Sequence, residues 1–347
     1  MKESDGAKDK KSAAFTSRRF FLSPDIMGVM SSNTETKDMR ALVREGESIS
    51  PHTTFGMGGM ARYFCEAETP SNIIQFIRYA CRNGIPYKII AGGSNLVVSD
   101  RELPFLVIKV NGGEMTVADG AIEVDAGVPL MSLIETAIKN GYGGLETLSG
   151  IPGSVGGAIY GNAAAYGQAI SERLVDVSVY DPEKDEVNVM AASACGFGYR
   201  ESAFKHELSN LVILSARFWF EKSNKEGLRQ KSEEIIEKRK KKYIPGVRTP
   251  GSFFKNLLAD ELPQHILDKI PNLKDFYGKV PAWYFLNEVG ARGMRHGGLR
   301  IADFHGNYII NDGNATYEEV RELASLLKQK VREKFGVELE EEIRYLE

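Results

Sequence analysis

Apolar residues follow two different spacings along this chain. Short runs rich in β-branched and aromatic residues are typical of strands, whereas apolar residues three and four positions apart are typical of amphipathic helices. The first pattern predicts strands at 86–90, 96–98, 106–110, 121–124, 175–180, 211–214 and 307–311, and the second predicts helices at 69–84, 129–140, 226–242 and 316–335. The chain mixes helices and strands without strict alternation, which predicts an α+β fold.

We expect these predicted elements to fall into four parts. We expect residues 1–45 to be a disordered extension, because they are largely polar and their one apolar run, near Phe20, is shorter than the roughly 7–15 residues of a secretory signal. The other expected parts are 46–110 together with a C-terminal strand at 342–347, then 111–222, and finally 223–341. No run of about 20 apolar residues occurs, so we expect no membrane insertion.

Overall composition narrows the functional classes. The chain has 347 residues, 42% hydrophobic and 26% charged, which is typical of a globular protein with two or three domains. A formal net charge of −3 argues against a nucleic-acid partner. The three cysteines have no C-x-x-C spacing, so we expect reduced thiols in a cytoplasmic protein and no metal site.

The densest glycine cluster lies between Leu148 and Gly167, with six glycines in 20 residues. Glycine adds no side-chain packing and costs conformational entropy, so such a cluster needs a local reason. Close approach of the backbone to a ligand such as a phosphate is the usual one, and a tight loop between packed elements is the alternative. Pro152 and Asn162 are typical turn residues, which favours a ligand cradle.

A second glycine-rich turn, Gly92-Gly93-Ser94-Asn95, lies between two predicted strands. Its backbone amides, with the side chains of Ser94 and Asn95, suit an anion such as a pyrophosphate. Neither glycine stretch contains the G-x-G-x-x-G fingerprint of an ordinary Rossmann domain. We therefore expect the two loops to hold one extended dinucleotide between them.

Three polar residues have surroundings that a scaffold alone does not require. Arg200 lies among aromatic residues and glycines, which suits recognition of a carboxylate, although an ion pair with Glu201 or another acid is the alternative. Ser252 has no G-x-S-x-G pattern around it, so it is a candidate proton donor or a turn-capping hydroxyl. Glu342 shares a strand face with Arg344 by the period of two, or it belongs to a solvated chain end.

Six motifs occur in order along the chain: T-T-F-x-x-G-G-x-A at 53–61, A-G-G-S-N-L at 91–96, G-I-P-G-S-V-G-G at 150–157, F-G-Y-R-x-S-x-F-K at 197–205, G-S-F-F-K-N at 251–256 and L-E-x-E-I-R at 339–344. With them, the chain resembles the UDP-N-acetylenolpyruvoylglucosamine reductase family over about 50–345. The short segment between Arg200 and Ser252 is similar to the branch that lacks the tyrosine loop. The resemblance implies an FAD-binding domain of the vanillyl-alcohol-oxidase (PCMH) type in two subdomains, followed by a C-terminal α+β substrate-binding domain.

The resemblance also implies an FAD enzyme that uses NADPH to reduce UDP-N-acetylglucosamine enolpyruvate for peptidoglycan synthesis. It implies three catalytic residues: Arg200 polarises the substrate carboxylate, Ser252 donates a proton, and Glu342 stabilises the enol intermediate. The implied substrate-binding residues are Tyr166, Tyr199, Lys242, Asn256 and Arg344. The expected cofactor-binding residues of the two loops are Gly92, Gly93, Ser94, Asn95, Leu96, Gly150, Ile151, Pro152, Gly153, Ser154, Gly156, Gly157, Asn162 and Ala163.

Two features depart from the family pattern. The usual L-E-P-E is L-E-E-E at 339–342, and residues 257–280 resemble an insertion without an assigned role. Two other functions stay open: an FAD-dependent oxidase of the same superfamily acting on another substrate, and a flavin- or nucleotide-binding module without catalysis. The sequence assigns no protein partner.

Overall fold

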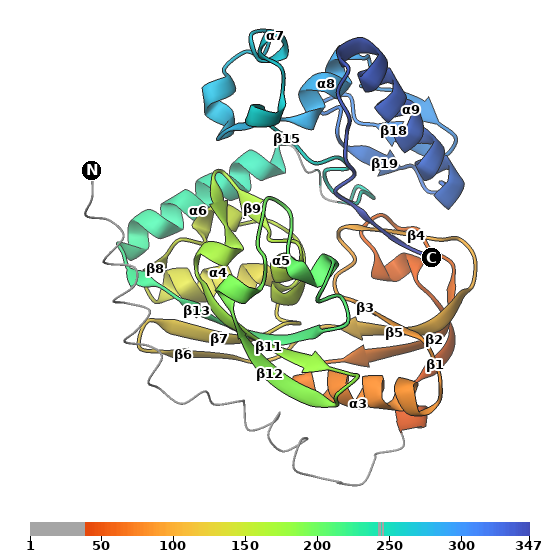
Figure 1. The fold of residues 1–347 in the computed structure, drawn as a ribbon, viewed down its shortest axis with the longest axis vertical. Coiled ribbons are helices and arrows are strands. Elements are labelled where there is room, and N and C mark those ends of the chain that lie inside the picture. The colour runs from red at the N-terminus through yellow and green to blue at the C-terminus, as the bar shows by residue number, and fades with distance from the viewer. Residues whose placement is uncertain (1–38, 242–243, 245) are drawn as a thin grey trace.

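The computed structural model describes residues 39–241, 244 and 246–347. Two sheets lie side by side in the lower part of Figure 1, and most of the C-terminal residues form a separate layer above them. No helix in the described ranges is long and apolar enough to cross a membrane. The mixture of helices and strands confirms the predicted α+β class.

The first part is a four-stranded sheet with one helix against it. The strands follow the order β1 (Arg44–Ser48), β2 (Met60–Ala67), β5 (Leu103–Val110) and β3 (Tyr87–Ile90), with β1 antiparallel to β2 and the other pairs parallel. Helix α3 (Pro70–Arg82) begins where the Thr69 side chain accepts a hydrogen bond from the backbone N–H of Asn72. Two 3-10 turns precede β2, η1 (Met39–Leu42) and η2 (Ser50–His52).

The prediction of a disordered extension through residue 45 is wrong at its C-terminal end. Met39 and Val43 are buried in the same core as α3, and Arg44 begins β1. The sequence R-E-G-E-S of β1 has no apolar pattern that would predict a strand. This is because β1 lies at the sheet edge, where none of its side chains is buried. Residues 1–38 of the expected extension lie outside the described part of the chain.

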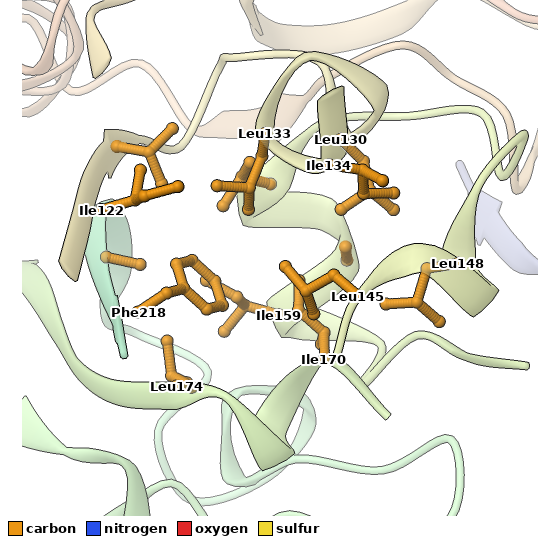
Figure 2. Close-up of a cluster of buried hydrophobic side chains, with 14 of the residues drawn as sticks. Ile122, Leu130, Leu133, Ile134, Leu145, Leu148, Ile159, Ile170, Leu174 and Phe218 are labelled. Atoms are coloured by element: carbon orange, nitrogen blue, oxygen red, sulfur yellow. The ribbon is translucent and has the colours of Figure 1, made fainter. Parts of the chain in front are cut away.

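The second part is a five-stranded antiparallel sheet. Its order is β12 (Glu186–Ala191), β11 (Leu174–Asp181), β13 (Val212–Trp219), β7 (Ala121–Asp125) and β6 (Met115–Ala118), which confirms the strands predicted at 121–124, 175–180 and 211–214. Helices α4 (Leu130–Lys139) and α5 (Val155–Tyr160) cover one face, and Figure 2 shows the side chains of Leu133, Ile159 and Phe218 in the core between them.

Shorter elements complete this second part. They are β8 (Tyr142–Gly143) paired with β14 (Glu221–Lys222), β9 (Ala164–Ala165) paired with β10 (Gln168–Ala169), and the 3-10 turns η3 (Glu146–Leu148), η4 (Ile170–Glu172), η5 (Ala192–Ala194) and η6 (Ala203–Lys205). Helix α6 (Lys225–Lys240) also belongs here by packing, since its Leu228 is buried in the same core and its Lys231 forms an ion pair with Glu146. The packing boundary therefore lies after α6 rather than at the expected residue 223.

The third part has its own hydrophobic core, which Phe55, Met57 and Val97 of the first part also join. It contains β15 (Leu257–Leu258), η7 (Ala259–Glu261), α7 (Gln264–Leu267), η8 (Leu273–Phe276), β16 (Lys279–Val280), α8 (Ala282–Glu288), the sheet β17 (Arg295–His296), β18 (Leu299–Ile301), β19 (Ile309–Asn311), and α9 (Tyr317–Phe335). Thr316 caps α9 in a capping box with Glu319. The unassigned 257–280 segment is closed at its base by pairing of β15 with β16.

The third part is joined back to the first by backbone contacts. Strand β20 (Arg344–Leu346) pairs in parallel with β4 (Leu96–Val98), directly after the Gly-Gly-Ser-Asn turn. The Thr54 hydroxyl donates to the Thr249 carbonyl at 2.8 Å, and the Thr249 N–H donates to the Thr54 carbonyl at 3.0 Å. Figure 1 shows the resulting path, in which the C-terminus returns to the side of β4.

Candidate active site

Arg200 lies on a tight turn with an unusual backbone conformation. Its φ is +57°, in the left-handed region that costs a non-glycine residue roughly 1–2 kcal/mol. Three contacts hold the turn: a bridge between Gly198 and Glu201, the Asn162 amide donating to the Gly198 carbonyl at 2.7 Å, and the Lys205 ammonium donating to the Arg200 carbonyl. Backbone strain that the surroundings enforce in this way is typical of functional sites.

The side chain of Arg200 forms an ion pair with Glu342. Arg200 Nε lies 2.9 Å from Glu342 Oε1, and the two side chains are 22% and 19% exposed. The buried Nε of Arg200 has no hydrogen-bond acceptor among the described residues, so its contact with Glu342 is an ion pair without the alignment of a hydrogen bond. The ion-pair alternative raised for Arg200 is therefore present, with Glu342 as the acid in place of Glu201. Both residues are also candidate catalytic groups, so the pair is compatible with either role.

Ser252 lies on a segment that is held by one buried asparagine. Asn307, 3% exposed, accepts a hydrogen bond from the Phe254 N–H through Oδ1 and donates to the Phe254 carbonyl through Nδ2, both at 2.8 Å. Its own carbonyl accepts from the Phe253 N–H at 3.1 Å, and Ser252 forms a bridge with Tyr308. The Asn307 side chain thus makes the two hydrogen bonds to the Phe254 backbone that a neighbouring strand would otherwise make.

Glu342 is held between the first and third parts of the molecule. Its N–H donates to the Phe253 carbonyl at 2.8 Å, and its carbonyl accepts from the Asn95 side-chain amide at 3.0 Å. The Arg344 N–H donates to the Asn95 carbonyl at 2.9 Å. The Gly-Gly-Ser-Asn turn therefore positions Glu342, which lies two residues before β20 begins. Because Glu342 is hydrogen-bonded to Phe253, it also lies opposite the residue that follows Ser252.

The two glycine loops lie against one another. The Ser94 hydroxyl donates to the Pro152 carbonyl at 3.3 Å, and a Cβ added to Gly153 would come within 3.2 Å of Ser94 Oγ. A Cβ on Gly93 would lie 2.3 Å from the His52 carbonyl oxygen, so only glycine fits there. The two loops therefore meet through the Ser94 side chain and the backbone of Pro152 and Gly153.

Several expected cofactor-binding residues have structural contacts of their own. The Ser154 hydroxyl caps α5 by accepting from the Gly157 N–H at 3.1 Å, and the amides of Asn95 and Asn162 donate to backbone carbonyls. Asn162 Oδ1 is nevertheless buried without a hydrogen-bond partner among the described residues. A buried orphan acceptor beside a glycine surface fits a ligand that donates a hydrogen bond there. The other expected residues, Gly92, Leu96, Gly150, Ile151, Gly156 and Ala163, lie on the same two loops or at their ends.

The expected substrate-binding residues fall into two groups. Tyr199 and Asn256 are adjacent, because the Asn256 N–H donates to the Tyr199 hydroxyl at 3.3 Å, and burial raises the pKa of this tyrosine, so its phenol stays protonated at neutral pH. Arg344 is exposed with its guanidinium 5.8 Å from the Tyr160 ring centre. Tyr166 is 37% exposed on the loop between β9 and β10. Lys242 lies outside the described residues.

Sequence reasoning assigned no role to four residues of this site: Tyr160, Lys205, Lys255 and Asn307. Lys205 and Lys255 are the lysines of the F-G-Y-R-x-S-x-F-K and G-S-F-F-K-N motifs, so their positions were marked by the motifs. Asn307 follows a glycine in a short loop and carries no distinguishing pattern. Within the described residues, no group of three His, Cys, Asp or Glu side chains could hold a metal ion.

Comparison with known proteins gives a consistent result. The family model of the UDP-N-acetylenolpyruvoylglucosamine reductase C-terminal domain matches residues 243–346, and that of an FAD-binding domain matches residues 61–188. The UDP-N-acetylenolpyruvoylglucosamine reductase of Solibacter usitatus is 40% identical over 298 residues, which cover 86% of this chain and 95% of that protein. The enzyme of the same name from Thermotoga maritima is 34% identical over 301 residues, covering 86% and 96%.

A solved structure extends the comparison to the fold. The crystal structure of UDP-N-acetylenolpyruvylglucosamine reductase from Thermus caldophilus matches with a TM-score of 0.68 at 28% identity, covering 88% of this chain and 100% of that one. The arrangement of an FAD-binding part and a reductase-specific C-terminal part confirms the expected fold. This chain belongs to the UDP-N-acetylenolpyruvoylglucosamine reductase family.

Proposed function

We propose that this chain reduces UDP-N-acetylglucosamine enolpyruvate to UDP-N-acetylmuramate, with FAD as cofactor and NADPH as reductant, in the synthesis of peptidoglycan precursors. The observation that carries the proposal is the convergence of three chain segments. Arg200 and Glu342 are 2.9 Å apart at Nε and Oε1, and Glu342 is bonded through its backbone both to the residue after Ser252 and to Asn95 of a glycine loop.

The glycine loops fit the cofactor. An FAD diphosphate needs close approach to backbone amides, and the surface made by Gly93 and Gly153 leaves no room for a Cβ without displacement of a neighbour. The orphan oxygen of Asn162 suits a donor group of the cofactor. When bound, FAD supplies the hydride that adds to the methylene carbon of the enolpyruvyl group.

The protein residues act on the charge and the proton. Addition at the methylene carbon leaves negative charge that spreads into the substrate carboxylate, and the Arg200 guanidinium stabilises it by charge-assisted hydrogen bonds. Glu342 keeps the guanidinium in place through Nε. The Ser252 hydroxyl donates its proton to the carbon beside the carboxylate, and solvent returns a proton to the serine.

The remaining substrate contacts are assigned by position. Tyr199, which precedes Arg200, is hydrogen-bonded to Asn256, Tyr166 lies on the loop between β9 and β10, and Arg344 begins β20. Lys242 is proposed for the substrate phosphates from its place ten residues before Ser252. We place the enzyme in the cytoplasm, because UDP-sugars and NADPH are cytoplasmic metabolites and all three cysteines are free thiols.

The experiment is an anaerobic titration of FAD-loaded protein followed by its flavin absorbance. NADPH should bleach the flavin, and UDP-N-acetylglucosamine enolpyruvate should then restore the absorbance. Ser252→Ala should bleach normally and recover at least tenfold more slowly, whereas Ser209→Ala, an exposed serine on a turn, should behave as the unchanged protein. Bleaching without recovery in the unchanged protein would reject the substrate, and normal recovery of Ser252→Ala would reject the serine as proton donor.

A further inference from the structure

Lys255 is a buried lysine next to the proposed reaction centre that the mechanism does not use. It is 9% exposed, and its ammonium lies 2.6 Å from Glu201 Oε1 and 2.5 Å from Glu340 Oε1. Glu201 follows Arg200 directly, and Glu340 lies two residues before Glu342. One ammonium therefore bridges the two chain segments that carry the proposed catalytic ion pair.

The main chain repeats this connection. The Lys255 N–H donates to the Glu340 carbonyl at 2.8 Å, and Phe254 forms an antiparallel bridge with Glu341. The segment after Ser252 and the segment before Glu342 are thus fixed to each other by backbone bonds alone. The side chain of Lys255 adds a charged link to the turn of Arg200 in the second part of the molecule, beside the hydrogen bond from the Asn256 N–H to the Tyr199 hydroxyl.

A second lysine competes for the same carboxylate. Lys205 Nζ donates to the Arg200 carbonyl and lies 3.7 Å from Glu201 Oε1. Since Arg200 has a left-handed backbone, its carbonyl direction depends on this bond. If Lys255 were absent, Glu201 Oε1 would lose its close donor while His206 stays 3.0 Å from Oε2, and Lys205 would be drawn toward Oε1 and away from the Arg200 carbonyl.

We propose that Lys255 is a positioning residue for the reduction: by occupying Glu201 it leaves Lys205 on the Arg200 carbonyl, and so it holds Arg200 opposite Glu342. The proposal rests on the catalytic roles of Arg200 and Glu342 proposed above. Lys255 itself touches neither residue's side chain, so it acts through Glu201 and Lys205. The charge states fit this arrangement, since burial alone would raise the pKa of Glu201, but hydrogen bonds from Lys255 and His206 lower it to about 2.

The test separates the two half-reactions. In Lys255→Met, which keeps the length of the side chain and removes its charge, NADPH should reduce the flavin within twofold of the normal rate. Reoxidation by UDP-N-acetylglucosamine enolpyruvate should slow by about 10- to 100-fold, the cost of misplacing a reacting group by about 1 Å. Lys334→Met is the matched control, because Lys334 pairs with Glu288 at the exposed surface. A change in overall stability would instead affect FAD content and both half-reactions.

The decisive variant is the double substitution Lys255→Met with Glu201→Gln. Removal of the carboxylate takes away the group that would draw Lys205 off the Arg200 carbonyl, so reoxidation should return to at least tenfold above that of Lys255→Met. A lysine that only stabilises the fold predicts a double variant as impaired as the single one.

Two results overturn the proposal: a reoxidation rate in Lys255→Met within twofold of normal, or a double variant that is reoxidised less than tenfold faster than the single one. If the unchanged protein is not reoxidised by the substrate, the proposed function fails first, which distinguishes the two failures.

Discussion

Asn307 is the residue whose replacement tests most directly how the Ser252 segment is held. Its side chain makes two hydrogen bonds to Phe254, each 2.8 Å long, in a position that is 3% exposed. Asn307→Ala would leave the N–H and the carbonyl of Phe254 without partners. An unsatisfied buried polar group costs about 1–3 kcal/mol, so the two together cost about 2–6 kcal/mol.

A loss of this size is measurable by urea unfolding. The chain has two tryptophans, Trp219 in β13 and Trp283 in α8, so a Trp219→Phe background reports the C-terminal part through Trp283. With a slope of about 2 kcal/mol per molar urea, the midpoint should fall by about 1–3 M. Asn314→Ala is the control: Asn314 is exposed, and its replacement should change stability by less than about 0.5 kcal/mol.

The outcome that refutes this reasoning is a loss below about 1 kcal/mol in Asn307→Ala. It would mean that water reaches Phe254, so the segment is not buried as the structure indicates. A large loss of stability with an unchanged rate of flavin reoxidation would separate the two roles, leaving Asn307 as a structural residue that does not position Ser252.

Three further predictions follow from individual contacts. The pKa of Glu201 is lowered to about 2, so its stabilising contribution is present above about pH 4.5 and is lost as the pH falls toward 2. Glu201→Gln removes this contribution, so the thermal midpoint should be lower than normal at pH 7–8 and its pH dependence between about pH 4.5 and 2 should be flatter. A Cβ on Gly59 would lie 2.2 Å from the Arg101 carbonyl oxygen, so Gly59→Ala should lower the free energy of unfolding by more than about 2 kcal/mol. Gly227 lies in helix α6, where a Cβ would make an ordinary contact at 3.9 Å, so Gly227→Ala should raise the free energy of unfolding by about 0.5–1 kcal/mol. Equal effects of the two substitutions would contradict the packing argument. Glu342→Gln keeps the shape of the side chain but removes the charge beside Arg200, so flavin reoxidation should slow by about 10- to 100-fold while reduction by NADPH is unaffected, as stopped-flow absorbance can measure.

Local patterns predicted the long helices α3, α4, α6 and α9 and the strands β3, β4, β5, β7, β11, β13, β19 and β20, but not most of the shorter elements. Helix α9 was predicted at 316–335 and occurs at Tyr317–Phe335, because its apolar spacing and the Thr316 cap are both encoded within the helix itself. Strand β1 was missed for the opposite reason: its stability comes from pairing with β2, and its own side chains carry no apolar pattern. The packing of α6 onto the second part was also missed, because an amphipathic pattern shows that a helix buries a face and not which core it joins.

The site was predicted less completely than the fold. Arg200, Ser252 and Glu342 were found through motifs, yet nothing local shows that Arg200 pairs with a residue 142 positions later, since that contact depends on the return of the C-terminus to β4. The contacts that hold these residues were not predicted, because the hydrogen-bond partner of an asparagine amide or a lysine ammonium depends on which segments the fold brings together.

The three proposed catalytic residues are held in the same way, and this affects how their neighbours should be tested. Each lies on an irregular segment, and an asparagine side chain is among the contacts that hold each segment: Asn162 binds the Gly198 carbonyl, Asn307 binds Phe254, and Asn95 binds the Glu342 carbonyl. Two of these asparagines lie on the glycine loops, where sequence reasoning assigned them to the cofactor. Replacement of Asn95 would release the Glu342 segment even if FAD bound normally, so loss of turnover alone cannot assign it to cofactor binding. FAD affinity and the rate of flavin reoxidation must therefore be measured separately, and a variant that retains FAD but is slowly reoxidised places the asparagine with the catalytic segment.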